Sequence, residues 1–134
     1  MNEVIRRAGP DDISRIAEIA DRKRTEYEQY QPVFWRRAPD ARKHHIQFLQ
    51  QLVSTDQVIV LVHERDGVVG GFVVASLLPP PPVYNPGGPT CLIDDYAVWD
   101  SNDWGTIGVA LLRAANEVAA GRGAVQTTVV CAHR

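Results

Sequence analysis

The length, composition and charge of this chain limit the classes of protein to which it can belong. Its 134 residues, 45% of them hydrophobic, are the size of one ordinary domain with a core of its own. With 14 lysines and arginines against 16 aspartates and glutamates, it lacks the broad cationic surface that nucleic acid or an anionic membrane requires. No apolar run resembles a signal peptide or a membrane span. We therefore expect one cytoplasmic domain over residues 1–134, with no nucleic-acid or membrane partner.

The N-terminal part of the sequence predicts one strand followed by two helices. Residues 1–9 read as a strand, and the PDD run at 10–12 begins a helix with acidic side chains at its positive end. Apolar residues at helical spacing continue this helix towards position 30, before Pro32. A second helix begins at Pro39 and Asp40. Its buried face is expected to consist of Ile46, Leu49, Leu52 and Val53.

The middle of the sequence changes to a β pattern. Residues 58–64 and 68–78 are rich in β-branched side chains, and the RDG turn between them predicts an antiparallel hairpin. Gly70 and Gly71 are expected to mark a bulge or a close approach in the second strand. The proline-rich run at 79–89 cannot belong to a central strand, so it is expected to form a long loop.

The C-terminal part predicts a parallel βαβ unit made of strand 91–99, helix 104–120 and strand 124–132. The whole order is then β-α-α-β-β-β-α-β, which is an α/β arrangement with a mixed sheet and helices on its faces. Strand 124–132 would leave a long apolar edge, which invites pairing with another chain. We therefore expect a homodimer.

This element order and the junction after Val98 resemble the GNAT (N-acetyltransferase) superfamily, whose members move an acyl group from acyl-coenzyme A to an amine. In that family a Val-x-Pro leads into Q/R-x-x-G-x-G/A. Here Asp100 stands at the proline, Asp103 at the Gln/Arg, Thr106 at the first glycine and Gly108 at the second. The family fold continues with one more helix and two more strands, so the resemblance covers about three quarters of the family domain.

The resemblance implies acetyl-CoA as cosubstrate, with its pyrophosphate on backbone N–H groups of the junction. A carboxylate at the start of a helix can instead occupy those N–H groups, so a helix capped by Ser101, Asn102 or Asp103 is the alternative. The expected cofactor-binding residues are Ala97, Val98, Asp103, Trp104, Gly105, Thr106, Ile107, Gly108 and Val109.

Two adjacent aspartates, Asp94 and Asp95, are the strongest candidates for catalysis. Attack by an amine requires that its ammonium form lose a proton, which a nearby carboxylate can accept. Regular alternation would place Asp94 and Tyr96 on one face of the strand and Asp95 on the other, so only one carboxylate could serve a given site. The family often has an acidic residue four positions before Val98, which is Asp94. Asp94, Asp95 and Tyr96 are the catalytic candidates; the alternative is that both carboxylates are satisfied by structural partners.

The charge pattern near the junction predicts the kind of acceptor. No lysine or arginine occurs between Gly67 and Leu112, whereas four aspartates lie there, and a negative cleft favours a cationic amine. The IDDYAV run is also similar to a segment of diamine acetyltransferases. Four aromatic residues of the first helix and the following link are typical of core or inter-helix packing, whereas the resemblance implies that they border the acceptor together with Asp94: Tyr27, Tyr30, Phe34 and Trp35.

Neither the histidines nor the cysteines predict another chemistry. His44 and His45 are neighbours on a helix and face different directions, so the sequence predicts no metal site. Cys91 and Cys131 are expected to be buried free thiols.

Two functions follow from the sequence. The first is an N-acetyltransferase that moves an acetyl group from acetyl-CoA to the primary amine of a small cationic substrate by direct attack. The alternative is a catalytically inactive, truncated GNAT-fold module that binds or dimerises. The family's acid, often a tyrosine on the helix after this part of the fold, has no counterpart among these residues.

Overall fold

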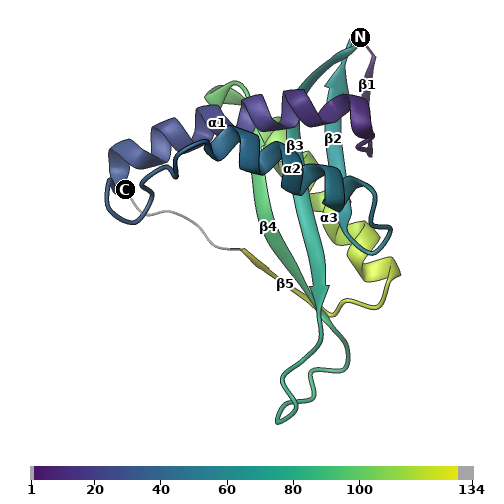
Figure 1. Cartoon of the computed structure of the whole chain (residues 1–134). Helices are drawn as coiled ribbons and strands as arrows, with labels where there is room; N and C mark the ends of the chain where they lie inside the picture. Colours follow the sequence, from purple (N-terminus) through teal and green to yellow (C-terminus); the bar gives the residue numbers. More distant parts are fainter. Residues whose placement is uncertain (1, 130–134) are drawn as a thin grey trace.

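The computed structural model describes residues 2–129, which form one five-stranded sheet covered by helices on both faces (Figure 1). The strands lie in chain order across the sheet. Neighbours are antiparallel except for the last pair, which is parallel, as the predicted βαβ unit requires. The strands are β1 (Glu3–Arg7), β2 (Ile59–Arg65), β3 (Val68–Leu78), β4 (Thr90–Val98) and β5 (Gln126–Val129).

The sheet separates the core into two layers, and three α-helices cover its two faces. One face of the sheet is covered by α1 (Ile13–Tyr30) and α2 (Ala41–Val53), and the other by α3 (Val109–Gly121). Alternating side chains of the central strands supply the two layers, because successive residues of a strand point to opposite faces. The predicted mixed sheet and element order are therefore confirmed. None of these helices within residues 2–129 has the length and apolarity needed to cross a membrane.

The expected buried face of α2 is confirmed. Leu49 is completely buried, and the other three predicted residues are partly buried against the same cluster: Ile46, Leu52 and Val53. Cys91 is a buried free thiol, and burial raises its pKa, so it is not a reactive nucleophile. Cys131 lies outside the described residues.

The turn between β2 and β3 and the two glycines of β3 also match their predictions. Asp66 and Gly67 both have positive φ, 51° and 82°, as a two-residue hairpin turn of this kind requires. Gly70 is the extra residue where the β2–β3 register shifts. A Cβ at Gly71 would lie 2.9 Å from the side chains of Ile107 and Leu111, so glycine is needed for the close approach of the α3 region.

A charged network fixes the start of α1. Asp12 is buried and accepts two hydrogen bonds from the Arg6 guanidinium, at 2.7 and 2.9 Å. The same carboxylate accepts the N–H of Gly9 at 2.8 Å, and Arg6 also donates to Glu64 at 3.1 Å. The hydrogen bonds from Arg6 hold the pKa of Asp12 below its ordinary value. The acidic start predicted for this helix is therefore a bridge between the helix and two strands of the sheet.

The junction after β4 is more complex than the single helix predicted from position 104. It begins with a 3₁₀ turn at Ser101–Asp103, continues as a π-helical turn at Trp104–Gly108 and becomes α-helical only at Val109. Asp100, not one of the three residues expected as alternative caps, accepts the N–H of Asn102 at 3.0 Å. The described part of the last strand is β5, whose four residues are all exposed.

Candidate functional site

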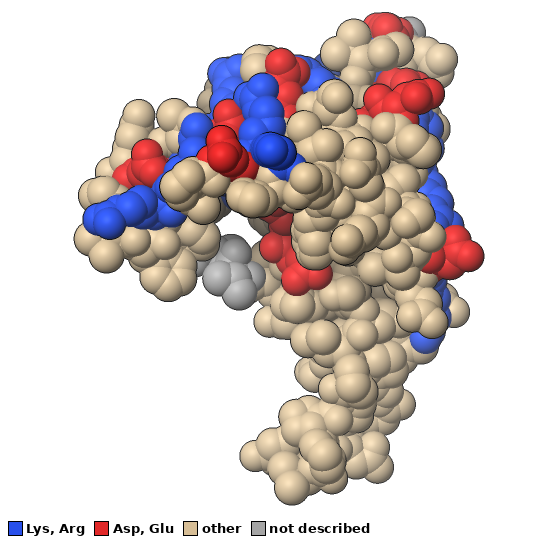
Figure 2. Space-filling view, viewed as in Figure 1, with Lys and Arg blue, Asp and Glu red and all other residues tan. Residues whose placement is uncertain are grey.

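A cavity of about 660 Å³ lies between α1, the 31–40 connection, α2 and the middle of β4. Figure 2 shows the hollow, with acidic side chains along its right-hand side and lysine and arginine side chains, interspersed with acidic ones, above it. We call it the α1–α2 cavity. Its aromatic lining consists of Tyr27, Phe34, Trp35 and Phe48, and its charged lining of Lys23, Arg24, Arg36, Arg37, Asp94 and Asp95.

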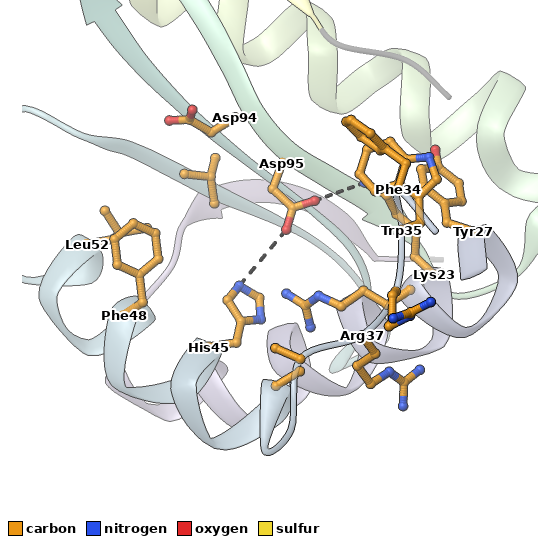
Figure 3. Close-up of a pocket in the computed structure, with 15 residues that line it drawn as sticks. Lys23, Tyr27, Phe34, Trp35, Arg37, His45, Phe48, Leu52, Asp94 and Asp95 are labelled. Atoms are coloured by element: carbon orange, nitrogen blue, oxygen red, sulfur yellow. Dashed lines mark hydrogen bonds and ion pairs between the residues drawn. The ribbon is translucent and has the colours of Figure 1, made fainter. Parts of the chain in front are cut away.

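Both aspartates of β4 line this cavity, contrary to the expectation that only one could (Figure 3). The cause is a bulge in the β3–β4 ladder. Val74 pairs with Asp95 and Ala75 pairs with Ile93, so Asp94 has no partner of its own in β3. The bulge interrupts the regular alternation on which the prediction depended. A bulge of this kind had no recognisable signal in the IDDYAV run.

Asp95 is held by a salt bridge and is not an available base. Lys23 Nζ lies 2.9 Å from Asp95 Oδ1 and 2.8 Å from the carbonyl oxygen of Tyr96. The Lys23 side chain is only 16% exposed, so this pair is poorly screened by solvent. Asp95 therefore has an ion-pair partner of the kind that the alternative named.

Asp94 has a different environment at the same cavity. It is exposed, and its Oδ2 accepts a hydrogen bond from the Ser76 hydroxyl at 3.1 Å. Within residues 2–129, no lysine, arginine or histidine nitrogen lies at ion-pair distance from it. Asp94 is therefore a carboxylate that remains able to bind an ammonium group or accept a proton.

His45 is a cavity residue that the sequence did not identify as part of a site. Its Nε2 lies 4.0 Å from Asp95 Oδ2, a contact drawn as a dashed line in Figure 3. Burial and the nearby positive charge of Arg24 lower the pKa of His45 to about 4. The imidazole is therefore neutral at neutral pH, and this contact is not an ion pair. Only the packing of α2 against α1 and β4 brings it here, so the HH pair alone gave no signal.

Tyr96 is not part of the cavity lining, although the Lys23 ammonium lies 5.7 Å from its ring centroid. Its ring makes an edge contact with Trp104, with the ring centroids 5.2 Å apart, and it packs with the α3-side cluster. The structure therefore does not bring its side chain together with Asp94 and Asp95 in the α1–α2 cavity.

Three of the four aromatic residues proposed to border an acceptor line the cavity. Trp35 makes edge contacts with Tyr27 and Phe34, at centroid distances of 5.4 and 4.7 Å. Tyr30 is not part of this lining, and its hydroxyl donates to Glu26 at 2.9 Å. Phe34 is 75% exposed as a residue, so this part of the lining is open to solvent.

The junction residues expected to hold a coenzyme lie together at the end of β4. Ala97, Val98, Ile107 and Gly108 are buried. The other expected residues of the junction are partly buried or exposed: Asp103, Trp104, Gly105, Thr106 and Val109.

The carboxylate of Asp103 does not cap the helix. Its Oδ1 contacts the Thr106 hydroxyl at 3.5 Å, and it accepts no backbone N–H within residues 2–129. The expected self-capping by Asp103 is therefore absent from the described residues. A Cβ at Gly105 would meet no atom within 4 Å, so the surface of this turn is open.

Basic side chains reach the junction from parts of the chain remote in sequence. A small cavity of about 180 Å³ beside it is lined by Arg15, His63 and Arg65 as well as by Asp100 and Asp103. The guanidinium of Arg15 also stacks on Trp99 at 4.5 Å from the ring centroid. The absence of basic residues between positions 67 and 112 therefore does not make the junction uniformly acidic.

Comparisons with known proteins agree on the fold. The chain is similar to a predicted acetyltransferase from Clostridium acetobutylicum, solved with acetyl-CoA, at TM-score 0.76 and 17% identity over 98% of this chain and 82% of that chain. A mutant of the BH1408 protein from Bacillus halodurans gives TM-score 0.82 and 19% identity over 96% and 82%. The aminoglycoside 6′-N-acetyltransferase AAC(6′)-Ih from Acinetobacter baumannii gives TM-score 0.69 and 15% identity over 98% and 80%.

The sequence itself gives no such match. No protein-family model matches it, and a search of curated proteins found no similar sequence. At these low identities the solved structures establish the fold without the activity. The order of the strands, the helices on both faces and the strand–turn–helix junction together give this chain the fold of the GNAT acetyltransferases.

Proposed function

We propose that this chain is an N-acetyltransferase that moves an acetyl group from acetyl-CoA to the primary amine of a small molecule, which binds as its ammonium cation. The observation that carries this proposal is Asp94. It is an exposed carboxylate without a cationic partner among residues 2–129, placed by a bulge at the floor of the α1–α2 cavity. Its strand leads directly into the junction that would hold the coenzyme.

The junction residues fit acetyl-CoA as a cosubstrate. The first N–H groups of a helix have no intrahelical acceptors, and the Asp103 side chain does not occupy those of the π-helical turn. The backbone N–H groups between Gly105 and Gly108 would hold the pyrophosphate. Acetyl-CoA supplies the activated acyl group.

In the proposed reaction Asp94 acts on the acceptor amine. It binds the ammonium group and takes its proton, directly or through one water, which leaves a nucleophilic nitrogen. That nitrogen attacks the thioester carbonyl, so the C–N bond forms and the C–S bond breaks. The thiolate that leaves takes a proton from solvent or from the new amide nitrogen. We give Asp95 no step because it is paired with Lys23, and Tyr96 none because it does not line the cavity.

The first experiment is a titration of the full chain with acetyl-CoA by calorimetry, followed by turnover assays on a panel of amines. D94N is expected to lower kcat/KM by about a hundredfold or more, because a general base contributes at least that much. D56N, which also removes one carboxylate and lies at an exposed site, is the control and should keep full activity. Unchanged turnover of D94N would reject the role of Asp94.

The alternative function is a binding or dimerising module without catalysis. It is favoured by Asp103 and Thr106, which replace the Gln/Arg and glycine of the family motif. Failure of the titration to detect acetyl-CoA would support this alternative over the enzyme.

We further propose that the protein acts in the cytoplasm as a homodimer that pairs through the edge at β5. All four described residues of β5 are exposed, and an open strand edge can pair with a second copy. Light scattering on the purified chain tests the oligomeric state. A monomer at micromolar concentration would reject this pairing.

A further inference from the structure

The charged lining of the α1–α2 cavity indicates which chemical group the acceptor has in addition to its amine. Four cationic side chains line it, against two carboxylates. Lys23 is paired with Asp95, and Arg37 lies 3.4 Å from the carboxylate of Asp21 and donates to the Thr25 hydroxyl. These pairs use both Nη groups of Arg37, although its Nε is buried without a partner within residues 2–129. The charged side chains of the lining that remain without an ion pair are Asp94, Arg24 and Arg36.

Arg24 is the most informative of the remaining cations. Its Nη1 is buried and has no hydrogen-bond partner within residues 2–129. A buried donor without a partner costs about 1–3 kcal/mol, and more if it is charged. Arg36, in contrast, is exposed, so water satisfies it. Because Arg24 lines the cavity, a carboxylate bound there would give its guanidinium an acceptor that residues 2–129 do not provide.

His45 adds a second unsatisfied nitrogen to the same wall. Its side chain is only 10% exposed, and its Nδ1 has no hydrogen-bond partner among the described residues. The neutral imidazole can donate one hydrogen bond without competing with Arg24 for the negative charge. The nearest acidic group to His45, Asp95, is already paired with Lys23.

On the premise of the proposed function, we infer that the acceptor is an amino carboxylate with an apolar side chain, such as an amino acid. Its carboxylate binds the Arg24 guanidinium, its ammonium group binds Asp94, and its side chain packs on Trp35 and Phe34. A planar guanidinium matches a carboxylate in a two-point hydrogen bond. A polycation would place a second positive charge beside Arg24, so the cavity disfavours it. The cations come from α1 and the 31–40 connection, which is why the charge pattern of residues 67–112 alone predicted only a cationic amine.

Matched substrates test the inference directly. Phenylalanine is compared with 2-phenylethylamine, and leucine with 3-methylbutylamine, each pair differing only in the carboxylate. With acetyl-CoA and the full chain, we expect kcat/KM to be at least about tenfold higher for each amino acid, as one charged hydrogen bond provides. Equal or better use of the decarboxylated amines would overturn the inference and leave the proposed acetyl transfer intact. Absence of turnover with every amine of the panel would overturn the proposed function itself.

A binding experiment separates the role of Arg24 from catalysis. Binding of 3-phenylpropionate, which has the carboxylate and no amine, is measured by calorimetry without coenzyme. R24M should weaken it by about tenfold or more, and R24K should weaken it less, because the charge remains while the two-point geometry is lost. K43M removes a positive charge from the outer face of α2 and should not change the affinity.

The fold of each variant is checked by its thermal transition. R24M removes an unsatisfied charge and is expected to melt at or above the temperature of the original chain. Affinity for 3-phenylpropionate that is equal in R24M and the original chain would overturn the assignment of Arg24. So would equal binding of 3-phenylpropanol, which has no negative charge.

Discussion

Two charged networks of this molecule can be compared, one at the start of α1 and one at the α1–α2 cavity. In the first, Arg6 donates to both oxygens of Asp12 and to Glu64, and the Asp12 carboxylate also accepts the Gly9 N–H. In the second, Lys23 and Asp95 pair, whereas buried nitrogens of Arg24 and His45 have no partner among residues 2–129.

The difference separates groups that stabilise the fold from groups that can bind a ligand. Every buried polar atom costs free energy unless it is hydrogen-bonded. The Arg6–Asp12 network meets that cost internally, so it links β1, β2 and α1. In the cavity network some buried nitrogens lack a hydrogen-bond partner among residues 2–129, and a bound carboxylate would provide one.

The largest effect is expected from acid, because protonation of His45, which belongs to the cavity network, should lower the free energy of unfolding. Because the pKa of His45 is about 4 in the folded chain and near 6.5 in an unfolded one, only the unfolded chain binds this proton between those values. The free energy of unfolding should therefore fall as the pH is lowered from about 6.5 to about 4, by up to about 3 kcal/mol. Denaturant titrations across this range measure it.

The H45Q and H44Q pair gives the matched comparison. H45Q removes the buried imidazole and should flatten the fall, whereas H44Q removes its exposed neighbour and should leave the fall unchanged. An equally steep fall in H45Q would show that another group titrates in this range.

The Arg6–Asp12 network should respond to mutation at neutral pH. D12A leaves Arg6 and the Gly9 N–H without their acceptor, and we expect the free energy of unfolding to drop by about 2 kcal/mol. The value is below that of a fully buried pair because the Arg6 side chain is 36% exposed. The pKa of Asp12 is lowered in the folded chain. Its contribution to the free energy of unfolding is therefore fully present at pH values above the ordinary pKa of an aspartate, and it is lost as the pH falls towards the lowered pKa. D11A, at the exposed neighbouring position, should have little effect.

The contrast between these networks also explains what the sequence could predict. The RDG turn, the proline loop and the apolar spacing of α2 are local signals, and each led to the observed element. The start of α1 was recognised as acidic, but Arg6 and Glu64 join Asp12 from separate strands. No local pattern specifies such long-range partners.

The candidate site was predictable only where its residues were close in sequence. Asp94 and its neighbours were found because they lie in one strand, and Trp35 because it lies in an aromatic cluster. The bulge at Asp94 depends on the pairing of β3 with β4, and the ion pair of Asp95 with Lys23 depends on the packing of α1 against β4. The unsatisfied nitrogen of Arg24 depends on how α1 is buried. The acidic appearance of the cleft was therefore incomplete, since its cations come from a different part of the chain.

The smallest effect is expected at the junction, where the Asp103 carboxylate can be compared with the charged groups of the cavity. Asp103 does not cap the helix, so its carboxylate remains close to where a pyrophosphate would bind. D103R replaces that repulsion by attraction and should tighten acetyl-CoA binding by about threefold to tenfold at low salt, with a smaller gain as salt screens the charge. E117R makes the same change of charge on an exposed part of α3, so it measures the effect of net charge alone. The affinity of both variants for acetyl-CoA is measured by calorimetry. Equal gains in affinity would mean that the junction does not contact the pyrophosphate. A gain confined to D103R would place the coenzyme beside the residue that departs from the family motif.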